Sequence, residues 1–286
     1  MKIETLSVVV GTNACNAHCP YCVSKMTMTE NTSKAVAKQL DERNFSKACR
    51  LAQQNGVSTA LVTGKGEPTL YMGTVVDMVE KLDQYFPLIE LQTNGYLLHS
   101  NSFEMLELLR KRGLTTVIIS IVHYDAKKNN EIYQFPQPCF LELLIQQIHE
   151  AGLSVRLSCV MLKGYIDSID EVGNLLQFAK NNKIEQLTIR SVEVPEVSKN
   201  EKIYEWTKVH KIEQHTFDLI SQHYDVNSKL LMNLGHGAKV YDHQGQNLCI
   251  SNCLTLDSNP ENIRQLIYFP DGHLYYDWVY PGAILI

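Results

Sequence analysis

Three cysteines stand close together at Cys15, Cys19 and Cys22, with the spacing C-x3-C-x2-C. They follow an apolar run at 6–11, and a short loop at the end of a strand can fold three thiolates toward one point. Thiolates are soft ligands that suit iron–sulfur clusters or zinc. A tetrahedral zinc ion needs a fourth ligand, whereas a [4Fe–4S] cluster held by three cysteines keeps one iron open for a substrate or cofactor. The spacing favours a cluster, and a zinc knuckle or three unrelated thiols are the alternatives.

A second candidate site is the stretch Gly64-Lys65-Gly66-Glu67-Pro68, which follows another apolar run at 58–63. Its two glycines permit close backbone approach or unusual dihedral angles, and a carboxylate lies in the same turn. Taken alone, this stretch reads as a tight strand-to-helix turn with a solvated glutamate.

The cysteine spacing, with Tyr21 just before the third cysteine, resembles the C-x3-C-x-aromatic-C signature of the radical S-adenosylmethionine (radical SAM) enzymes. The resemblance implies that Cys15, Cys19 and Cys22 hold a [4Fe–4S] cluster. It also implies that the open iron chelates the methionyl amine and carboxylate of S-adenosylmethionine, and that Tyr21 lies near the adenine.

The glycine–glutamate turn is similar to the Gly-Gly-Glu-Pro element of the same family. Gly66, Glu67 and Pro68 match that element, and Lys65 replaces its first glycine. By resemblance, the turn backbone at Gly66 and the Glu67 carboxylate hold the methionyl amine. The amine contact can come from a backbone carbonyl, which the lysine leaves intact.

Apolar runs and helical spacing alternate along the first two-thirds of the chain. Strands are predicted near 5–11, 58–63, 89–94, 116–122, 155–160 and 186–190, and helices near 44–55, 72–85, 102–112, 140–151 and 168–181. This alternation predicts an α/β fold with a parallel sheet and right-handed crossovers. In βα barrels the active site collects at the C-terminal strand ends, where both candidate motifs lie. The strand count agrees with the partial six-stranded (βα)6 barrel of the radical SAM family.

Side chains alternate between the two faces of a strand, so Arg156 and Ser158 should share one face, opposite Leu157 and Cys159. The simplest arrangement points the polar residues into the barrel and the apolar ones toward the helices. By resemblance, inward polar residues contact S-adenosylmethionine, and the candidates are Asn94, Ser120, Arg156 and Ser158. The alternative for each is an ordinary hydrogen-bonded interior residue.

The pattern changes after residue 195. The expected domains are a radical SAM barrel core at 1–195 and a C-terminal α+β appendage at 196–286 that closes the barrel. The appendage should contain a helix at 201–223 and a hairpin formed by 265–269 and 273–278 around Pro270-Asp271-Gly272.

The other cysteines are expected to be ordinary thiols. Cys249 and Cys253 lie downstream of His236 and His243, a set that invites a zinc or auxiliary-cluster interpretation. Their spacing does not match paired zinc knuckles, which favours reduced thiols. Cys49 and Cys159 fall on predicted core faces. Cys139 is the one unassigned thiol that could join Cys249 and Cys253, since Pro136 and Pro138 just before it suggest that it begins near an exposed loop.

The composition is that of a soluble globular protein, with 44% hydrophobic and 20% charged residues. The formal charge is 26 − 31 = −5, which leaves no basic surplus for a nucleic-acid partner. No apolar stretch is long enough to span a membrane, and the N-terminus lacks a signal-peptide pattern. Eight cysteines without an export signal indicate a reducing compartment, so the expected location is the cytoplasm.

The resulting hypothesis is a radical SAM enzyme. The resemblance implies that an external electron donor such as flavodoxin or ferredoxin reduces the cluster. S-adenosylmethionine is then cleaved to methionine and a 5′-deoxyadenosyl radical, which abstracts hydrogen from a small-molecule or nucleotide substrate. The general look of the chain, including the stretch 155–181, is similar to the molybdenum-cofactor cyclase branch, although the arginine-rich tail expected there is missing. The alternatives are a radical SAM enzyme acting on a peptide or RNA, and a non-enzymatic iron–sulfur or zinc protein.

Overall fold

The computed structural model describes residues 3–27, 40–99, 102–251 and 263–286. Six parallel strands form the centre of its sheet, and each pairs with the next one along the chain. They are β1 (Ile3–Val9), β2 (Thr59–Thr63), β3 (Leu88–Thr93), β4 (Thr116–Ile121), β5 (Ser154–Met161) and β6 (Gln186–Ser191). The predicted six strands and their order are confirmed.

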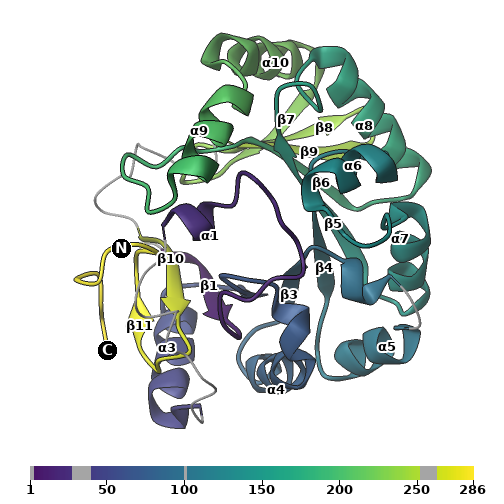
Figure 1. Cartoon of the computed structure of the whole chain (residues 1–286). Helices are drawn as coiled ribbons and strands as arrows, with labels where there is room; N and C mark the ends of the chain where they lie inside the picture. Colours follow the sequence, from purple (N-terminus) through teal and green to yellow (C-terminus); the bar gives the residue numbers. More distant parts are fainter. Residues whose placement is uncertain (1–2, 28–39, 100–101, 252–262) are drawn as a thin grey trace.

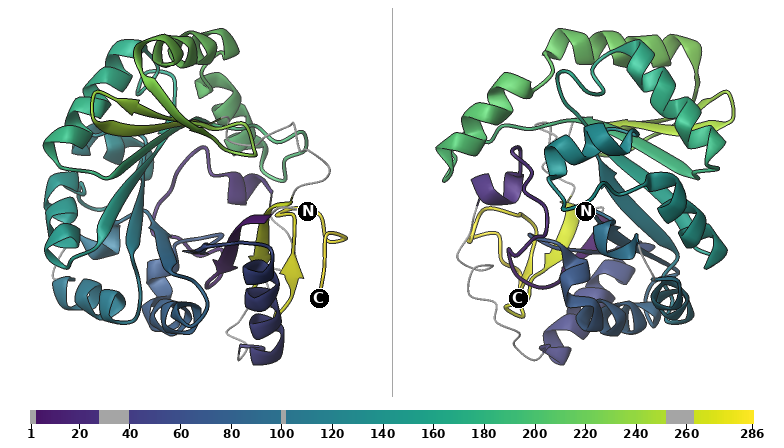
Figure 2. Two further views of the ribbon diagram at one scale, coloured as in Figure 1. Left: turned by 180° about the vertical axis from the view of Figure 1, so that it is seen from behind. Right: turned by 45° about the vertical axis from the view of Figure 1, so that its right-hand side comes forward.

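The connecting helices lie on the convex face of the sheet, which curves as in a partial barrel (Figures 1 and 2). They are α3 (Glu42–Gln54), α4 (Met72–Asp83), α5 (Phe103–Lys111), α7 (Leu141–Glu150) and α8 (Ile169–Asn181). The loop between β1 and the short helix α1 (Val23–Met26) lies inside the curve. The predicted α/β fold and partial barrel are confirmed, and the described sheet does not close on itself.

Local sequence explains where these helices begin. The Asp41 side chain accepts a hydrogen bond from Asn44 N at 2.9 Å and caps α3. Ser168 caps α8 in the same way, through Glu171 N at 3.2 Å. The buried face of α3 packs on the sheet through Phe45, Ala48, Cys49 and Ala52. Cys49 is therefore the core residue that the helical spacing predicted.

The expected single helix at 201–223 is wrong, because two helices occupy this region. They are α9 (Glu201–His210) and α10 (Gln214–Asn227). The chain turns between them because Lys211 has extended backbone dihedrals and Ile212 is only 3% exposed. Burying Ile212 there stabilises the break.

Five more strands extend the same sheet at both edges. They are β7 (Lys229–Asn233), β8 (Lys239–His243), β9 (Gln246–Ser251), β10 (Ile263–Tyr268) and β11 (Leu274–Tyr275). β9 pairs in parallel with β6, and β10 pairs in parallel with β1. The antiparallel β10–β11 pair confirms the predicted hairpin. The domain division at residue 195 stays a prediction. None of the described helices combines the length and apolarity that a membrane crossing needs.

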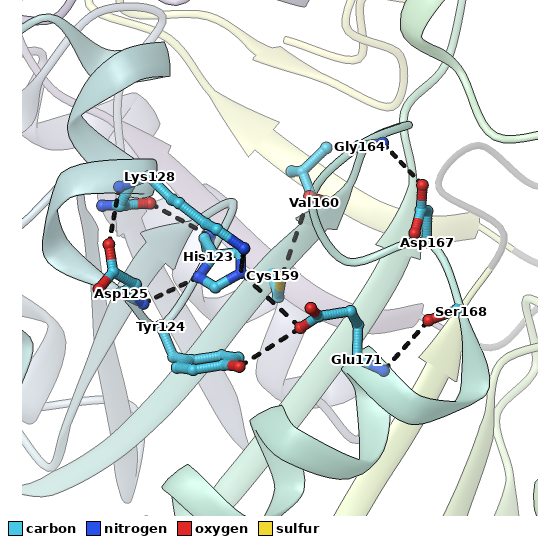
Figure 3. Close-up of polar contacts among 11 residues, drawn as sticks. His123, Tyr124, Asp125, Lys128, Cys159, Val160, Gly164, Asp167, Ser168 and Glu171 are labelled. Carbon is cyan, nitrogen blue, oxygen red and sulfur yellow. Dashed lines mark hydrogen bonds and ion pairs between the residues drawn. The ribbon is translucent and has the colours of Figure 1, made fainter.

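One further helix, α6 (Ala126–Tyr133), had not been predicted because it carries few apolar residues. Asp125 caps it by accepting hydrogen bonds from Lys127 N and Lys128 N. Figure 3 shows the connection from β4 to α6, in which the His123 ring lies beside Lys128 and the Glu171 carboxylate of α8. Two 3-10 turns complete the described elements, η1 (Pro68–Tyr71) and η2 (Tyr96–Leu98).

Candidate cofactor site

The cysteine loop leaves the C-terminal end of β1 and leads into α1. Cys15 is exposed, and Cys19 and Cys22 are partly buried. The backbone of the loop shapes the environment of the first thiol, because Ala17 N donates to Cys15 Sγ at 3.4 Å. The loop is also tied to α6, since His18 N donates to Tyr133 O at 2.9 Å. All three thiols are thus presented from one loop at the barrel mouth.

The glycine–glutamate turn after β2 packs directly on the cysteine loop. Gly66 N donates to Thr12 O at 3.2 Å, and Glu67 N donates to Ala14 O at 2.9 Å. A Cβ at Gly66 would come within 2.0 Å of Ala14 O, so no larger residue fits without moving the loop. The two sequence motifs therefore form one unit, and Gly66 is required by close approach.

Glu67 lies inside this unit and is only 4% exposed, so the solvated-glutamate alternative is wrong. Oε1 accepts from Thr69 N at 3.0 Å and from the hydroxyls of Thr69 and Thr93 at 2.6 Å each. Oε2 accepts from Asn94 N at 2.9 Å. Within the described structure Oε2 accepts a single hydrogen bond, so it keeps capacity for a further donor.

Asn94 joins the end of β3 to the cysteine loop. Its Nδ2 donates to Asn16 Oδ1 at 2.7 Å and lies 3.9 Å from Cys15 Sγ. Its Oδ1 accepts from Tyr96 N at 3.1 Å, which starts η2. The ends of β1, β2 and β3 are thereby connected around Cys15.

A row of polar side chains continues from this unit across the concave face. Gln92 Oε1 lies 3.5 Å from the Thr63 hydroxyl, and Gln92 Nε2 lies 3.4 Å from the Ser120 hydroxyl. Ser120 pairs in register with Ser158 of β5, and Ser158 pairs with Thr188 of β6. Strand alternation in the sequence predicts this row, because it puts Gln92, Ser120, Ser158 and Thr188 on the inward faces of their strands.

The fifth strand has the predicted orientation on its apolar side. Leu157 and Cys159 are fully buried in the main core, together with residues of α7 and α8. Arg156 lies near the N-terminal end of β5, where its guanidinium contacts Glu90 and donates to Gln186 Oε1 at 2.7 Å. Burial raises the pKa of Glu90, and the Arg156 charge opposes that rise.

A small apolar layer packs against the other side of the cysteine loop. It contacts Cys19 and Tyr21 and consists of Ala17, Val122, Ile132, Tyr133, Phe135, Val160, Leu162 and Val192. The hydroxyls of Tyr21 and Tyr133 lie 3.5 Å apart. Tyr96 stacks on Phe135 with ring centroids 4.4 Å apart. Sequence reasoning missed this layer because α6 was not predicted.

Arg190, at the C-terminal end of β6, was also missed as a site residue. Its charge lowers the pKa of both Tyr21 and Tyr133, although burial raises each pKa more strongly. Its Nε is buried and has no hydrogen-bond partner in the described part of the chain. A cationic side chain with a spare donor therefore lies beside the aromatic residues of the mouth. Arg190 lies two residues after Thr188 and so shares its inward strand face, which is the sequence signal that could have identified Arg190 as a site residue.

The loop chemistry fits an iron–sulfur cluster. Burial and, after it, the neighbouring thiols of Cys22 and Cys15 raise the pKa of Cys19 to about 12. Such thiols ionise readily only beside compensating positive charge, which metal ions supply. The side chains of Asn13 and Asn16 each have a buried polar atom without a partner among the described residues. The donor set and these unpaired atoms are consistent with a bound group here.

Among the described residues, no three Cys, His, Asp or Glu side chains gather as ligands of one metal ion would. The three thiolates of a cubane site need not converge on one atom, because each of them binds a different iron. Cys249 lies on β9, His236 contacts Glu4, and His243 contacts Ser228. Cys253 lies outside the described residues. Cys139 follows the exposed loop residues Pro136 and Gln137, as expected, but its own side chain is only 3% exposed and packs in the core.

Comparison with protein families decides which family the chain belongs to. The family model described as "Radical SAM superfamily" matches residues 9–179, which include the cysteine loop, the turn and strands β2 to β5. The chain belongs to the radical SAM superfamily. It is a radical SAM enzyme, and its cofactors are the [4Fe–4S] cluster and S-adenosylmethionine that this family uses.

Relatives of known name point to one branch of the superfamily. The chain is 29% identical over 220 residues to the GTP 3′,8-cyclase of Helicobacter pylori, covering 75% of this chain and 62% of that protein. It is 30% identical over 189 residues to the GTP 3′,8-cyclase of Aliarcobacter butzleri, covering 63% and 53%. The chain thus spans about half to three-fifths of the length of these relatives.

Solved structures share the fold. The protein SuiB of Streptococcus suis, solved with the precursor peptide SuiA, has a TM-score of 0.61 at 17% identity, covering 97% of this chain and 60% of that chain. The protein anSMEcpe, solved with bound S-adenosylmethionine, has a TM-score of 0.60 at 13% identity, covering 99% and 77%. At these identities the likeness concerns the fold alone.

Proposed function

We propose that the chain cleaves S-adenosylmethionine reductively at a cluster held by Cys15, Cys19 and Cys22, and abstracts hydrogen from an anionic small molecule of the nucleotide class. The observation that carries this proposal is the packing of the glycine–glutamate turn on the cysteine loop, through Glu67 N and Ala14 O at 2.9 Å. This contact joins the turn that carries the buried Glu67 carboxylate to the loop that carries the three cysteines. The bound cluster and S-adenosylmethionine together supply the one-electron chemistry.

The chain's own residues orient the cofactor. The turn backbone at Gly66 and the spare acceptor capacity of Glu67 Oε2 bind the methionyl ammonium, a charge-assisted contact. Tyr21 lies at the adenine side of the loop, against the apolar layer that keeps water out. Asn94 fixes the loop beside Cys15. Ser120 and Ser158 offer hydroxyls to the ribose and carboxylate from the concave face.

Arg156 has a more indirect role in this proposal. Its guanidinium is engaged by Glu90 and Gln186 toward the N-terminal strand ends. It contributes to cofactor binding by holding β5 in register with β3 and β6. This register sets the position of Ser158 along the strand. The pair spans β4, so its loss would affect three strands together.

Two observations support the substrate class. The curated relatives named above are GTP 3′,8-cyclases, which act on a nucleotide by name. Arg190 presents a buried, unpartnered Nε at the mouth within the described structure. A guanidinium in such a position suits a phosphate or carboxylate group. The electron comes from an external donor such as flavodoxin or ferredoxin, and the proposed location is the cytoplasm.

The test is anaerobic incubation of the reconstituted protein with S-adenosylmethionine, a chemical reductant and a panel of nucleotides that includes GTP. We expect methionine and 5′-deoxyadenosine to form, and a substrate nucleotide to increase their formation. Deuterium placed on that nucleotide should appear in 5′-deoxyadenosine. If the reduced protein releases no 5′-deoxyadenosine, the reaction class is wrong. If only peptides stimulate the reaction, the substrate class is wrong.

A further inference from the structure

Lys65 occupies the turn position where the family element has glycine, and its side chain makes contacts that glycine cannot make. Its Nζ donates to the Trp278 backbone carbonyl oxygen at 3.2 Å. The same Nζ lies 5.1 Å from the centroid of the Trp278 ring, within the range of a cation–π contact. The cofactor turn is therefore joined to a segment more than two hundred residues later in the sequence.

The partner segment is the 276–283 loop, which leaves β11 and returns to it. Tyr276 N donates to Ala283 O at 3.0 Å, and Tyr275 bridges Ile284 at the base of the loop. Inside the loop, Asp277 Oδ1 accepts from Val279 N at 2.7 Å and from Tyr280 N at 3.0 Å. These bonds give the loop a defined shape, and Lys65 ties that shape to the turn.

The Trp278 ring connects the loop to the strand that precedes the cysteines. It packs edge-on against Phe269, with ring centroids 5.6 Å apart. Phe269 belongs to a small apolar cluster with Val9, the last residue of β1. The 276–283 loop is thus attached to the cofactor unit twice, through Trp278 to β1 and through Lys65 to the turn.

The surroundings of the ammonium agree with this geometry. Burial lowers the pKa of Lys65 to about 8, while the nearby Asp277 carboxylate and Cys22 thiol act in the opposite direction. Lys65 therefore lies between the 276–283 loop and the cysteine loop. A methylene chain that crosses this space also fills it, so the contact has both a packing and an electrostatic part.

We propose that Lys65 is a positioning residue that holds the 276–283 loop against the glycine–glutamate turn, so that order in this loop and binding of S-adenosylmethionine are coupled. The inference rests on the proposed function, because it takes the turn as part of the S-adenosylmethionine site. By thermodynamic reciprocity, a link that helps S-adenosylmethionine to bind must also make the bound cofactor protect the loop.

The first measurement needs no cofactor other than the reconstituted cluster. Hydrogen–deuterium exchange of peptides within 272–286 is compared between wild type and Lys65→Met, which keeps the chain length and removes the charge. Lys65→Met should exchange roughly tenfold faster in this segment, as expected for the loss of one charged hydrogen bond. Lys65→Arg should restore part of the protection. Lys81→Met is the matched control, because Lys81 pairs with Glu42 on the outer helices.

The second measurement is the affinity for S-adenosylmethionine by calorimetry, with iron content checked for each variant. Lys65→Met should bind roughly tenfold more weakly at unchanged iron content. In wild type, S-adenosylmethionine should slow exchange at 276–283, and in Lys65→Met this protection should be much smaller. If Lys65→Met lost its cluster or its fold, Trp278→Leu, which keeps the carbonyl and removes the ring, would serve for the same comparison.

The possible failures are distinguishable. Equal exchange at 276–283 in wild type and Lys65→Met, or faster exchange with unchanged affinity, would overturn the Lys65 inference and leave the proposed function standing. A wild-type protein that carries the cluster and binds no S-adenosylmethionine would overturn the proposed function itself.

Discussion

Glu67 connects two βα loops through one buried carboxylate. Four donors from η1 and from the end of β3 reach its two oxygens. Because a buried carboxylate costs free energy unless it is hydrogen-bonded, these donors explain how the charge is accommodated. The same bonds hold Asn94 beside the cysteine loop. Glu67 therefore organises the site, in addition to its proposed contact with the methionyl ammonium.

Replacing Glu67 by glutamine tests both parts of this role. An amide nitrogen in place of one oxygen cannot accept a hydrogen bond, so at least one buried donor loses its partner. We expect Glu67→Gln to lower the free energy of unfolding by about 1–3 kcal/mol, and to weaken S-adenosylmethionine binding roughly tenfold or more. Chemical denaturation and calorimetry measure the two effects. Glu42→Gln, at an exposed ion pair, is the control, and equal behaviour of the two variants would contradict this role.

The sequence could identify Glu67 as a candidate but could not predict its environment. Its donors come from Thr69, nearby in sequence, and from Thr93 and Asn94 on another strand. The contacts with Thr93 and Asn94 depend on how β2 and β3 pair, and the spacing of residues in the sequence carries no information on that pairing. Lys65 illustrates the same limit, since its partner Trp278 lies in a segment that the sequence assigned only to a hairpin.

At the scale of elements, strand parity was predictable because alternation is a property of the backbone. Leu157 and Cys159 lie in the core, and Ser158 aligns with Ser120 and Thr188. Helix α6 was less predictable. Asp125 is a suitable N-cap residue, but the residues after it lack the apolar spacing that indicates a helix. The break between α9 and α10 was hidden for the opposite reason, because the apolar spacing continues across it.

A pair of substitutions on β5 separates the two faces. Ser158→Ala should impair turnover more than stability, because the hydroxyl faces the site. Cys159→Ser should cost about 1–3 kcal/mol of stability and leave turnover nearly normal, because it puts a hydroxyl into a fully buried apolar layer. Denaturation curves and 5′-deoxyadenosine formation provide the two readouts. The reverse pattern would mean that the strand is out of register by one residue.

The connection from β4 to α6 predicts a dependence of stability on pH. His123 is 1% exposed, and its Nδ1 accepts from Asp125 N at 2.9 Å, a bond that only the neutral ring can make. Burial and then Lys128 lower the pKa of His123, while Glu171, Asp125 and Glu131 oppose this shift. The folded state therefore binds fewer protons at this ring than the unfolded state.

The stabilisation from His123 is therefore fully present above the ordinary histidine pKa of about 6.5. It is lost as the pH falls toward the lower pKa that His123 has in the folded protein. Wild-type stability in urea should fall between pH 8 and pH 5.5 by more than that of His123→Gln, whose neutral side chain does not titrate. An identical fall in both proteins would assign the pH dependence to other groups.

For the whole molecule, the strands after residue 195 extend the central sheet at both edges. β9 extends it beside β6, and β10 extends it beside β1. The turn between β7 and β8 also returns to the first strand, because Gly235 N and His236 Nδ1 contact the Glu4 carboxylate at 2.8 and 2.9 Å. Sequence patterns predicted the six central strands, whereas these edge pairings depend on long-range contacts that no local pattern encodes.

The whole chain should hold a single cluster. An auxiliary cubane usually needs three or four cysteines, and Cys49, Cys139 and Cys159 are buried in the core. Cys249 lies opposite Thr188 on β9. We expect about four irons per chain in wild type and in Cys249→Ala/Cys253→Ala after anaerobic reconstitution. A reproducible loss of iron in the double variant would reveal a second metal site.

The measurement that tests the central claim most directly is electron paramagnetic resonance of the reduced, reconstituted protein with and without S-adenosylmethionine. The wild-type [4Fe–4S] signal should change when the cofactor binds, because the open iron gains an amine and a carboxylate ligand. Cys15→Ala/Cys19→Ala/Cys22→Ala should give no such signal. A cluster retained in the triple variant, or a wild-type signal that S-adenosylmethionine leaves unchanged, would contradict the assignment of these three cysteines.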